Sequence, residues 1–217
     1  MCGIVAVSLK GITPDQVNLV ERVLSESQIR GMHASGVAWQ EEGSLKRIAE
    51  PVPITKLLED NPALVSGAVS DSELNLIAHI RYSTSDLEFN QPIANQKLAI
   101  AHNGIITQTD SMGWESEFSL KVSTRNDSEL ILRALQVGED PIVKFKDASI
   151  AYISLDDTGE IKYARNGKRP LWITEFPNGF IITSTDNIMF RASYGEFKAR
   201  MITATGTGEE LQLGEID

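Results

Sequence analysis

The sequence contains one cysteine, Cys2, among its 217 residues. An internal disulfide is therefore excluded, and a reduced, cytoplasmic setting is expected for this chain. The three histidines, His33, His79 and His102, lack the spacing of metal ligands, so we expect neither a metal nor another cofactor. No apolar run approaches the roughly 20 residues of a membrane span, and the first residues do not have the pattern of a signal peptide.

Positive charge is also scarce, with 20 basic against 30 acidic side chains and a net charge of −10. Binding to nucleic acid or to an anionic membrane needs a positive field, so we expect neither kind of partner. Hydrophobic residues make up 41% of the chain, as in ordinary globular proteins, and no Pro/Gly/Ser-rich linker divides it. We expect a single domain over 1–217, with a core over about 2–195 and an extension or tail over 196–217.

Local patterns predict two amphipathic helices. Thr13-Pro14-Asp15-Gln16 combines an N-cap, a proline at the first helical position and a glutamine at the third, which predicts a helix from Pro14 to about Ile29. Gly31 can close this helix. Apolar residues at helical spacing predict a second helix over Ser128–Val137.

Short apolar runs between turn residues predict the strands. They cover 3–9, 36–40, 45–48, 76–80 and 98–101, with a short helix expected over 56–59. The final third resembles a meander of two hairpins, which pair 149–155 with 161–164 and 171–176 with 180–184. Strands first and last, with helices between them, indicate an α+β fold in which sheets pack together and are covered by helices.

Cys2 stands directly before the apolar segment Gly3-Ile4-Val5-Ala6-Val7. Removal of the initiator methionine would place a free α-amine and a thiol on the same residue. An α-amine has a reference pKa of roughly 7.7–8.0, so it can serve as a general base at neutral pH. Nucleophile and base would then share Cys2. On this segment alone, a buried apolar cysteine at the start of a strand is the better explanation.

Five further segments place polar groups at turns and strand ends: Arg30-Gly31-Met32-His33-Ala34-Ser35-Gly36, His79-Ile80-Arg81-Tyr82-Ser83-Thr84, Gln91-Pro92-Ile93, Ala101-His102-Asn103-Gly104-Ile105-Ile106 and Asn126-Asp127-Ser128-Glu129. Each one has a purely structural explanation. Asn103-Gly104 is typical of a hairpin turn, and Asp127 or Asn126 could cap a helix. Arg81 alone would be a surface charge, and His79 and His102 would be hydrogen-bonded core residues.

Taken together, these segments resemble class II glutamine amidotransferase domains, whose N-terminal cysteine is the nucleophile of an Ntn-hydrolase fold. The matching motifs occur in the family's order and approximate spacing: Cys2-Gly3-Ile4, Arg30-Gly31 with Gly36, Arg81-Tyr82-Ser83-Thr84, His102-Asn103-Gly104, Asp127-Ser128-Glu129, and a late Arg165 with Arg169-Pro170-Leu171. The resemblance covers Cys2 to about Tyr194. Arg81-Tyr82 is similar to the phosphoribosylpyrophosphate amidotransferase type. The resemblance implies a four-layer αββα sandwich of two antiparallel sheets covered by helices.

The resemblance also implies an activity, the hydrolysis of L-glutamine to L-glutamate and ammonia through a Cys2 thioester. The roles that it implies are a nucleophile (Cys2), oxyanion donors (the Asn103 side chain and the Gly104 N–H), a ligand for the α-carboxylate (Arg81), a ligand for the α-ammonium (Asp127), further substrate-binding positions (Tyr82, Thr84 and His102) and a supporting turn (Arg30 and Gly31). A planar guanidinium suits Arg81 to bidentate contact with a carboxylate.

Two positions depart from the family's pattern. His33 stands where aspartate is common, and a histidine could accept a similar hydrogen bond. Thr84 is followed by Ser85-Asp86, without the usual histidine or glycine.

The family's second domain, which consumes the ammonia, is not expected within this chain. The resemblance therefore implies a separate synthetase or acceptor-activating protein that docks over the site, and a homo-oligomer is a further open expectation. Two alternatives stay open. One is a stand-alone amidohydrolase of the same fold acting on another γ-glutamyl or small-peptide amide. The other is a catalytically silent ligand-binding module, which a retained Met1 would favour.

Overall fold

The computed structural model of this chain describes residues 2–83 and 88–205. One sheet contains seven strands: β1 (Gly3–Lys10), β2 (Ala34–Glu41), β3 (Ser44–Glu50), β4 (Glu73–Arg81), β9 (Trp172–Phe176), β10 (Gly179–Thr183) and β11 (Arg200–Met201). A second sheet contains four strands: β5 (Ile93–Ala94), β6 (Leu98–Ile105), β7 (Ser149–Asp156) and β8 (Ile161–Arg165). The strand orders are β11-β9-β10-β1-β4-β2-β3 and β5-β6-β7-β8, and all the pairings are antiparallel.

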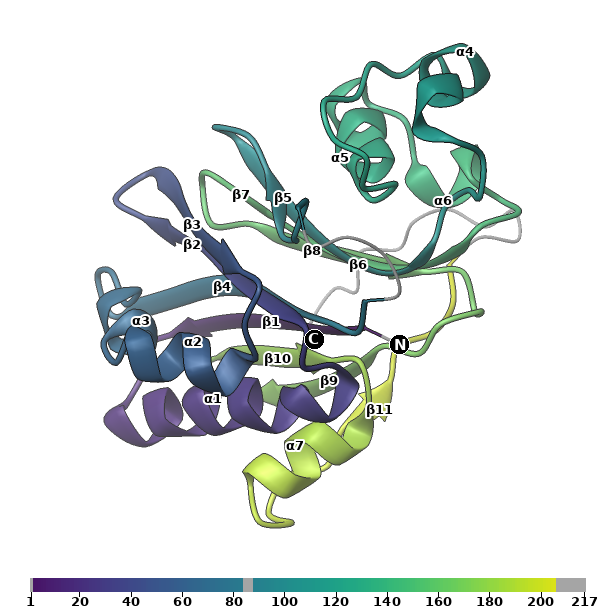
Figure 1. The fold of residues 1–217 in the computed structure, drawn as a ribbon. Coiled ribbons are helices and arrows are strands. Elements are labelled where there is room, and N and C mark those ends of the chain that lie inside the picture. Colours follow the sequence, from purple (N-terminus) through teal and green to yellow (C-terminus); the bar gives the residue numbers. More distant parts are fainter. Residues whose placement is uncertain (1, 84–87, 206–217) are drawn as a thin grey trace.

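The two sheets pack face to face, and helices cover both outer faces (Figure 1). The seven-stranded sheet is covered by α1 (Pro14–Glu26), α2 (Ile54–Asp60), α3 (Leu64–Gly67) and α7 (Asp186–Ala192). The four-stranded sheet is covered by α4 (Trp114–Phe118), α5 (Glu129–Gln136) and α6 (Pro141–Lys144). The short 3₁₀ helices are η1 (Ser27–Arg30) and η2 (Ser111–Gly113). The predicted four-layer αββα architecture is confirmed.

Strand β1 is apolar almost throughout because both of its faces are buried. Val5, Val7 and Leu9 pack against the helices, whereas Ile4 and Ala6 belong to the layer between the sheets. The same alternation occurs on β4, which pairs with β1, and on β6 of the other sheet. On β4, Ile77 lies in the layer between the sheets, and on β6 that layer contains Ala99 and Ala101.

This alternation places the polar residues that follow along each strand. Two positions from these apolar residues, toward one end of the sandwich, each strand or its extension carries a polar residue. These are Cys2 beside Ile4, His79 beside Ile77 and Asn103 beside Ala101. By period-two geometry, these three positions belong to the layer between the sheets, beyond its apolar part. The fold thus brings three chemically active side chains to one end of the sandwich.

The predicted elements are largely confirmed, with two corrections. The Thr13 capping box forms, and the first predicted helix is α1 followed by η1, which ends at Gly31. Both hairpins of the final third form, but β7–β8 belong to the four-stranded sheet and β9–β10 to the other, so the predicted meander is wrong. Helix α7 was not predicted, because its seven residues give only a short periodic signal.

Part of the expected extension packs on the sandwich. β11 pairs with β9, and Ile202 is buried between the sheets. Residues 206–217 lie outside the described chain.

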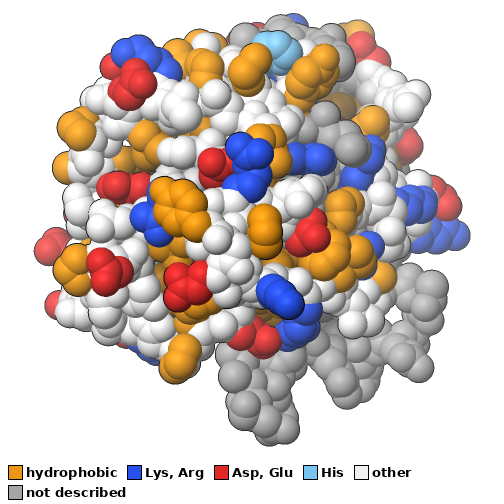
Figure 2. All heavy atoms as spheres, turned by 90° about the horizontal axis from the view of Figure 1, so that it is seen from below, with side chains coloured by type: hydrophobic (Ala, Val, Ile, Leu, Met, Phe, Trp, Pro, Cys, Tyr) orange, Lys and Arg blue, Asp and Glu red, His pale blue; other side chains and the backbone are white. Residues whose placement is uncertain are grey.

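Over the described residues, no helix is both long enough and apolar enough to cross a membrane. Figure 2 views the molecule from below, toward the helices that cover the seven-stranded sheet, and charges of both signs are interspersed on this face.

Candidate active site

A cavity of about 300 Å³ opens where β1, β4 and β6 end beside the start of α5. The residues that line it are mainly polar: Cys2, His79, Arg81, Tyr82, Ser83, Phe89, Gln91, His102, Gly104, Thr107, Trp114, Arg125, Asn126, Asp127 and Ser128. Apart from Cys2, ten of them come from four of the five further segments singled out in the sequence, and the other four are Phe89, Thr107, Trp114 and Arg125. Of the predicted site residues, the cavity brings together Cys2, Arg81, Tyr82, His102, Gly104 and Asp127, whereas Asn103, Arg30 and Gly31 are not among its lining residues. Thr84 lies outside the described residues.

Cys2 is enclosed by the Arg30-Gly31 turn and by the end of β4. Arg30 Nε donates a hydrogen bond to the Cys2 carbonyl oxygen at 3.4 Å, and the Cys2 Sγ lies 3.9 Å from the carbonyl oxygen of Tyr82. Burial lowers the pKa of Arg30, and the neighbouring Cys2 opposes this shift. A Cβ on Gly31 would lie 2.4 Å from the Arg81 carbonyl oxygen, so a larger residue would push the turn away from β4. This contact explains the glycine of the Arg-Gly motif.

His33 fulfils the role expected for an acceptor at its position. Its Nδ1 accepts a hydrogen bond from the Ser83 backbone N–H at 2.9 Å. The imidazole also packs against the Tyr82 ring, with centroids 5.1 Å apart. Tyr82 itself is 55% exposed, at the rim of the cavity. His33 therefore links the turn to the segment that follows β4.

Asn103 and Gly104 lie inside β6, opposite Ala151 and Ile150 on β7. The hairpin-turn interpretation of this dipeptide is therefore wrong. A Cβ on Gly104 would lie only 1.7 Å from the Ser149 carbonyl oxygen, so the strand pairing permits only glycine here. Asn103 is 2% exposed, and its Nδ2 has no hydrogen-bond partner among the described residues. A buried amide donor without a partner is costly, which indicates that it serves a ligand or a water molecule.

His102 is held in a closed network beside this dipeptide. Its Nε2 lies 3.2 Å from the Ser149 carbonyl oxygen, which can only accept, so Nε2 carries the proton. The Nδ1 then accepts from the Ser128 hydroxyl at 2.9 Å, and Ser128 accepts from Gln91 Nε2 at 2.9 Å. Gln91 Oε1 in turn accepts from the His102 backbone N–H at 2.6 Å. Burial lowers the pKa of His102, which keeps the ring neutral, as this network requires.

Opposite charges line the other end of the cavity. Asp127 Oδ2 accepts from the Ile106 backbone N–H at 2.7 Å, so this carboxylate joins the end of β6 to the start of α5. At the start of α5 it is Asn126 Oδ1 that accepts from the Ser128 N–H, at 3.1 Å, so of the two candidate capping residues the Asp127 side chain is not the one that serves the helix. Arg81 is held by its Nη1, which donates to Asn90 Oδ1 at 2.7 Å and to the Phe89 carbonyl oxygen at 3.2 Å. A guanidinium and a carboxylate in one cavity suit a zwitterion.

The late arginine segment is structural. Arg165 donates to the carbonyl oxygens of Arg169, Gly167 and Ile202, at 2.6, 3.1 and 2.9 Å. One side chain thereby fixes the loop that leads from β8 to β9 and the segment after β11. Leu171 at the end of this loop is fully buried between the sheets.

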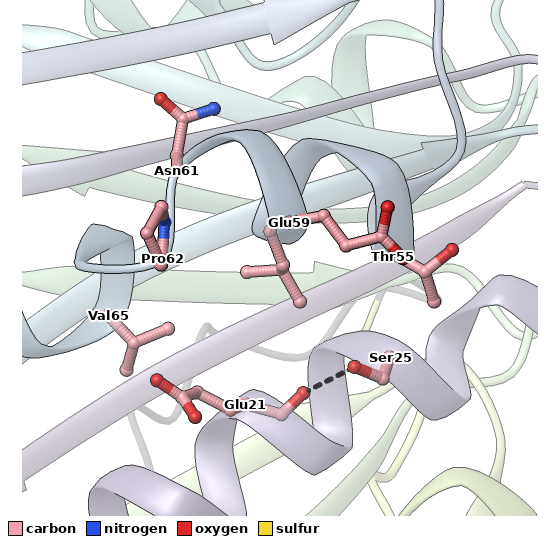
Figure 3. Close-up of a pocket in the computed structure, with 8 residues that line it drawn as sticks. Glu21, Ser25, Thr55, Glu59, Asn61, Pro62 and Val65 are labelled. Carbon is pink, nitrogen blue, oxygen red and sulfur yellow. Dashed lines mark hydrogen bonds between the residues drawn. The ribbon is translucent and has the colours of Figure 1, made fainter.

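A second pocket, of about 420 Å³, lies between α1 and α2 (Figure 3). Glu21 and Ser25 of α1 face Thr55 and Glu59 of α2 across it. The Ser25 hydroxyl donates a hydrogen bond to the Glu21 carbonyl oxygen at 2.9 Å. This pocket is larger than the cavity at Cys2 but contains no cysteine, and its Thr55 hydroxyl donates to Gln28 Oε1 at 2.6 Å. Within the part of the chain that the structure describes, no group of three His, Cys, Asp or Glu side chains could hold a metal. The Cys2 cavity is therefore the candidate active site.

Sequence reasoning missed three buried polar residues of this site, and four further lining residues, Phe89, Thr107, Trp114 and Arg125, lie outside every segment that it singled out. His79, Gln91 and Ser128 were noticed only as members of motifs, yet all three line the cavity. The period-two alternation along β4 and β6 was the signal for His79. Gln91 and Ser128 left no such signal, because their contacts with His102 join three segments of the chain.

Comparisons with known proteins agree with this geometry. The profile of the glutamine amidotransferase domain family matches residues 79–191. Among solved structures, the chain is similar to glutamine phosphoribosylpyrophosphate amidotransferase from B. subtilis, with a TM-score of 0.69, 21% identity, and coverage of 94% of this chain and 46% of that one. It is also similar to an allosteric regulatory enzyme of purine biosynthesis, with a TM-score of 0.68, 20% identity, and coverage of 94% and 45%.

A third similar structure is a glutamine aminotransferase class-II domain protein from Silicibacter pomeroyi, with a TM-score of 0.50, 12% identity, and coverage of 84% and 88%. No curated protein matches the sequence. The chain spans less than half of the length of the first two of these structures. At these identities, the structural similarity establishes the Ntn-hydrolase fold.

Proposed function

The chain belongs to the glutamine amidotransferase domain family, and we propose on this premise that it hydrolyses L-glutamine to L-glutamate and ammonia through a thioester on Cys2. The observation that carries the proposal is the cavity itself. It joins the cysteine to Gly104, next to the unpartnered Asn103 amide, and to the guanidinium of Arg81 and the carboxylate of Asp127. Glutamine needs all three features: a nucleophile for its amide carbon, donors for its amide oxygen and opposite charges for its amino-acid end.

Substrate binding is assigned to Arg81 and Asp127. A guanidinium can hold the α-carboxylate of glutamine, and the Asp127 carboxylate can hold the α-ammonium. The contact from the Ile106 N–H fixes the Asp127 carboxylate before substrate arrives, and Asn90 does the same for the Arg81 guanidinium. Tyr82 and His102 complete the walls of this pocket, and Thr84 is proposed as a further polar ligand.

Acylation begins once Met1 is removed. The α-amine of Cys2 takes the thiol proton, and the thiolate sulfur bonds to the amide carbon of glutamine. Negative charge then develops on the amide oxygen, which the Asn103 Nδ2 and the Gly104 N–H stabilise. The α-ammonium returns its proton to the amide nitrogen, the C–N bond breaks, and ammonia leaves behind a γ-glutamyl thioester.

Deacylation reverses these roles. Water gives a proton to the α-amine and its oxygen attacks the thioester carbon. The C–S bond breaks, the α-ammonium returns this proton to the sulfur, glutamate leaves, and the Cys2 thiol is restored. The Arg30-Gly31 turn supports both steps by fixing the Cys2 backbone.

We propose that the ammonia is used by a separate partner protein that carries an activated acceptor. Ammonia released into neutral water would be protonated, so the partner would dock over the mouth of the cavity beside the exposed Tyr82. A cytoplasmic setting suits the proposal because a free thiol persists in a reducing compartment.

The proposal is tested by measuring glutamate release from L-glutamine by the purified chain, with and without cell extract as a source of the partner. Cys2→Ala should abolish release, whereas a cysteine-independent contaminant would leave it unchanged. Preference for a substituted γ-glutamyl amide would select the stand-alone amidohydrolase. Binding of glutamine without any turnover would select the silent module.

A further inference from the structure

His79 is a buried side chain of the cavity that the proposed mechanism leaves unused. It is 1% exposed and lines the cavity from β4. Neither its Nδ1 nor its Nε2 has a hydrogen-bond partner among the described residues. His102, buried to the same degree in the same cavity, has partners for both ring nitrogens. The contrast indicates that the surroundings of His79 are arranged for something that binds there.

The protonation state of His79 fixes what it can offer. Burial, with smaller contributions from the nearby Arg81 and His102, lowers its pKa to about 3. The ring is therefore neutral at physiological pH. A neutral imidazole has one N–H donor and one nitrogen acceptor, so His79 can accept a hydrogen bond within the cavity. It has no excess proton to give to ammonia.

The strand register places His79 close to the reacting atoms. On β1 and β4, Ile4 lies opposite His79 and Gly3 opposite Ile80. Continued by one residue, this register puts Cys2 opposite Arg81, with His79 as the diagonal neighbour of Cys2 on the same face. Diagonal neighbours in a sheet lie about 7–8 Å apart, which is within reach of a substrate group held between them.

The proposed donors come from β6, where Gly104 lines the cavity and the neighbouring Asn103 Nδ2 is buried without a partner among the described residues. As donors, Asn103 Nδ2 and the Gly104 N–H can serve only the oxygen of a carboxamide. The oxygen and nitrogen of a carboxamide lie on different sides of its carbon, so a substrate whose oxygen is held by β6 has its amide nitrogen available to another wall of the cavity, which His79 lines from β4. That nitrogen carries two N–H donors, which need acceptors in a buried site.

We propose that His79 accepts a hydrogen bond from the side-chain N–H of bound glutamine and so makes the site selective for a carboxamide over an ester or a carboxylate. This inference rests on the proposed glutaminase function. It assigns to His79 a role in specificity and none in proton transfer. The product glutamate, which has no N–H at this position, cannot make the contact.

The test compares two substrates with the same acyl group, L-glutamine and L-glutamate γ-methyl ester, in the wild type and in His79→Leu and His79→Asn. Both substrates form the same Cys2 thioester, and kcat/KM reports on steps up to its formation. For His79→Leu, kcat/KM for glutamine should fall about 10-fold to 100-fold, while the value for the ester should change less than about 3-fold. His79→Asn keeps an acceptor oxygen and should recover part of the loss.

The outcomes separate a failure of the His79 inference from a failure of the proposed glutaminase function. If the wild type hydrolyses both substrates and His79→Leu lowers both by the same factor, His79 is structural or holds water, and only the inference fails. If the wild type hydrolyses neither, the proposed function fails and the inference with it.

A binding measurement tests the inference in variants that have lost catalytic activity. In a Cys2→Ala background, His79→Leu should weaken the binding of glutamine more than that of the ester, as measured by calorimetry. An equal change in the two affinities would also overturn the inference.

Discussion

Ser128 is the residue through which the site's hydrogen-bond network can be tested most sharply. Its hydroxyl stands at the centre of the network, donating to His102 Nδ1 and accepting from Gln91 Nε2, both at 2.9 Å. Ser128→Ala removes the hydroxyl and leaves the rest of the side chain in place. The substitution therefore takes one partner from each of two other side chains.

The structure sets the size of the effect. His102 is 2% exposed and Gln91 is 6% exposed, so water cannot readily replace the lost hydroxyl. A buried polar group that loses its partner costs about 1–3 kcal/mol. Two such groups give an expected loss of about 2–6 kcal/mol in the free energy of unfolding. Since whole domains are stable by about 5–15 kcal/mol, this loss would remove a large part of the stability.

Urea unfolding followed by circular dichroism measures the change, as a lower midpoint with an unchanged m-value. Ser44→Ala is the matched control, because Ser44 lies exposed on β3 and the same atom is removed. The control should stay within about 0.5 kcal/mol of the wild type. If Ser128→Ala proves as stable as Ser44→Ala, the network does not hold β6 and α5 together as described.

Three further predictions concern activity and pH. Asn103→Ala should lower kcat for glutamine about 10²-fold to 10³-fold with little change in KM, because it removes an oxyanion donor, and a change in KM alone would contradict that role. Arg81→Lys keeps the charge but loses the planar fork, so kcat/KM should fall at least about 10-fold in a steady-state glutaminase assay, and wild-type kinetics would argue against carboxylate binding. Because the pKa of His79 is lowered from 6.5 to about 3, the unfolded chain takes up a proton below pH 6.5 that the folded chain refuses. As the pH is lowered from 6.5 to 4, this residue should therefore reduce the free energy of unfolding by up to about 1.4 kcal/mol per pH unit. His79→Leu should flatten this pH dependence, measured by urea unfolding at each pH. Equal pH dependence in the wild type and the variant would show that His79 contributes nothing.

Much of the fold was predictable because it depends on local periodicity. The capping box at Thr13 and the apolar strand after Cys2 are encoded in consecutive residues, and both form as expected. The family motifs also identified most of the polar residues that line the cavity. Local signals could not assign the hairpins to sheets. β7–β8 and β9–β10 have similar patterns, and only tertiary packing separates them.

Two misreadings of the site have one physical cause. Asn103-Gly104 has the composition of a turn, but the glycine is required because the carbonyl oxygen of Ser149, on the neighbouring strand β7, approaches it closely. Asp127 has the position of a helix cap, but its carboxylate is bound by Ile106 from another segment. Long-range contacts override local preferences at both positions, and both positions lie in the candidate active site.

The account depends most directly on a processed N-terminus at which Cys2 carries a free amine and reacts with a glutamine mimic. Intact-mass measurement of the purified protein, before and after incubation with a diazoketone analogue of glutamine, tests both points together. We predict a mass that lacks Met1 and the addition of one analogue per chain, mapped to Cys2 by peptide sequencing. A retained Met1, or a processed chain that forms no adduct, would contradict the mechanism.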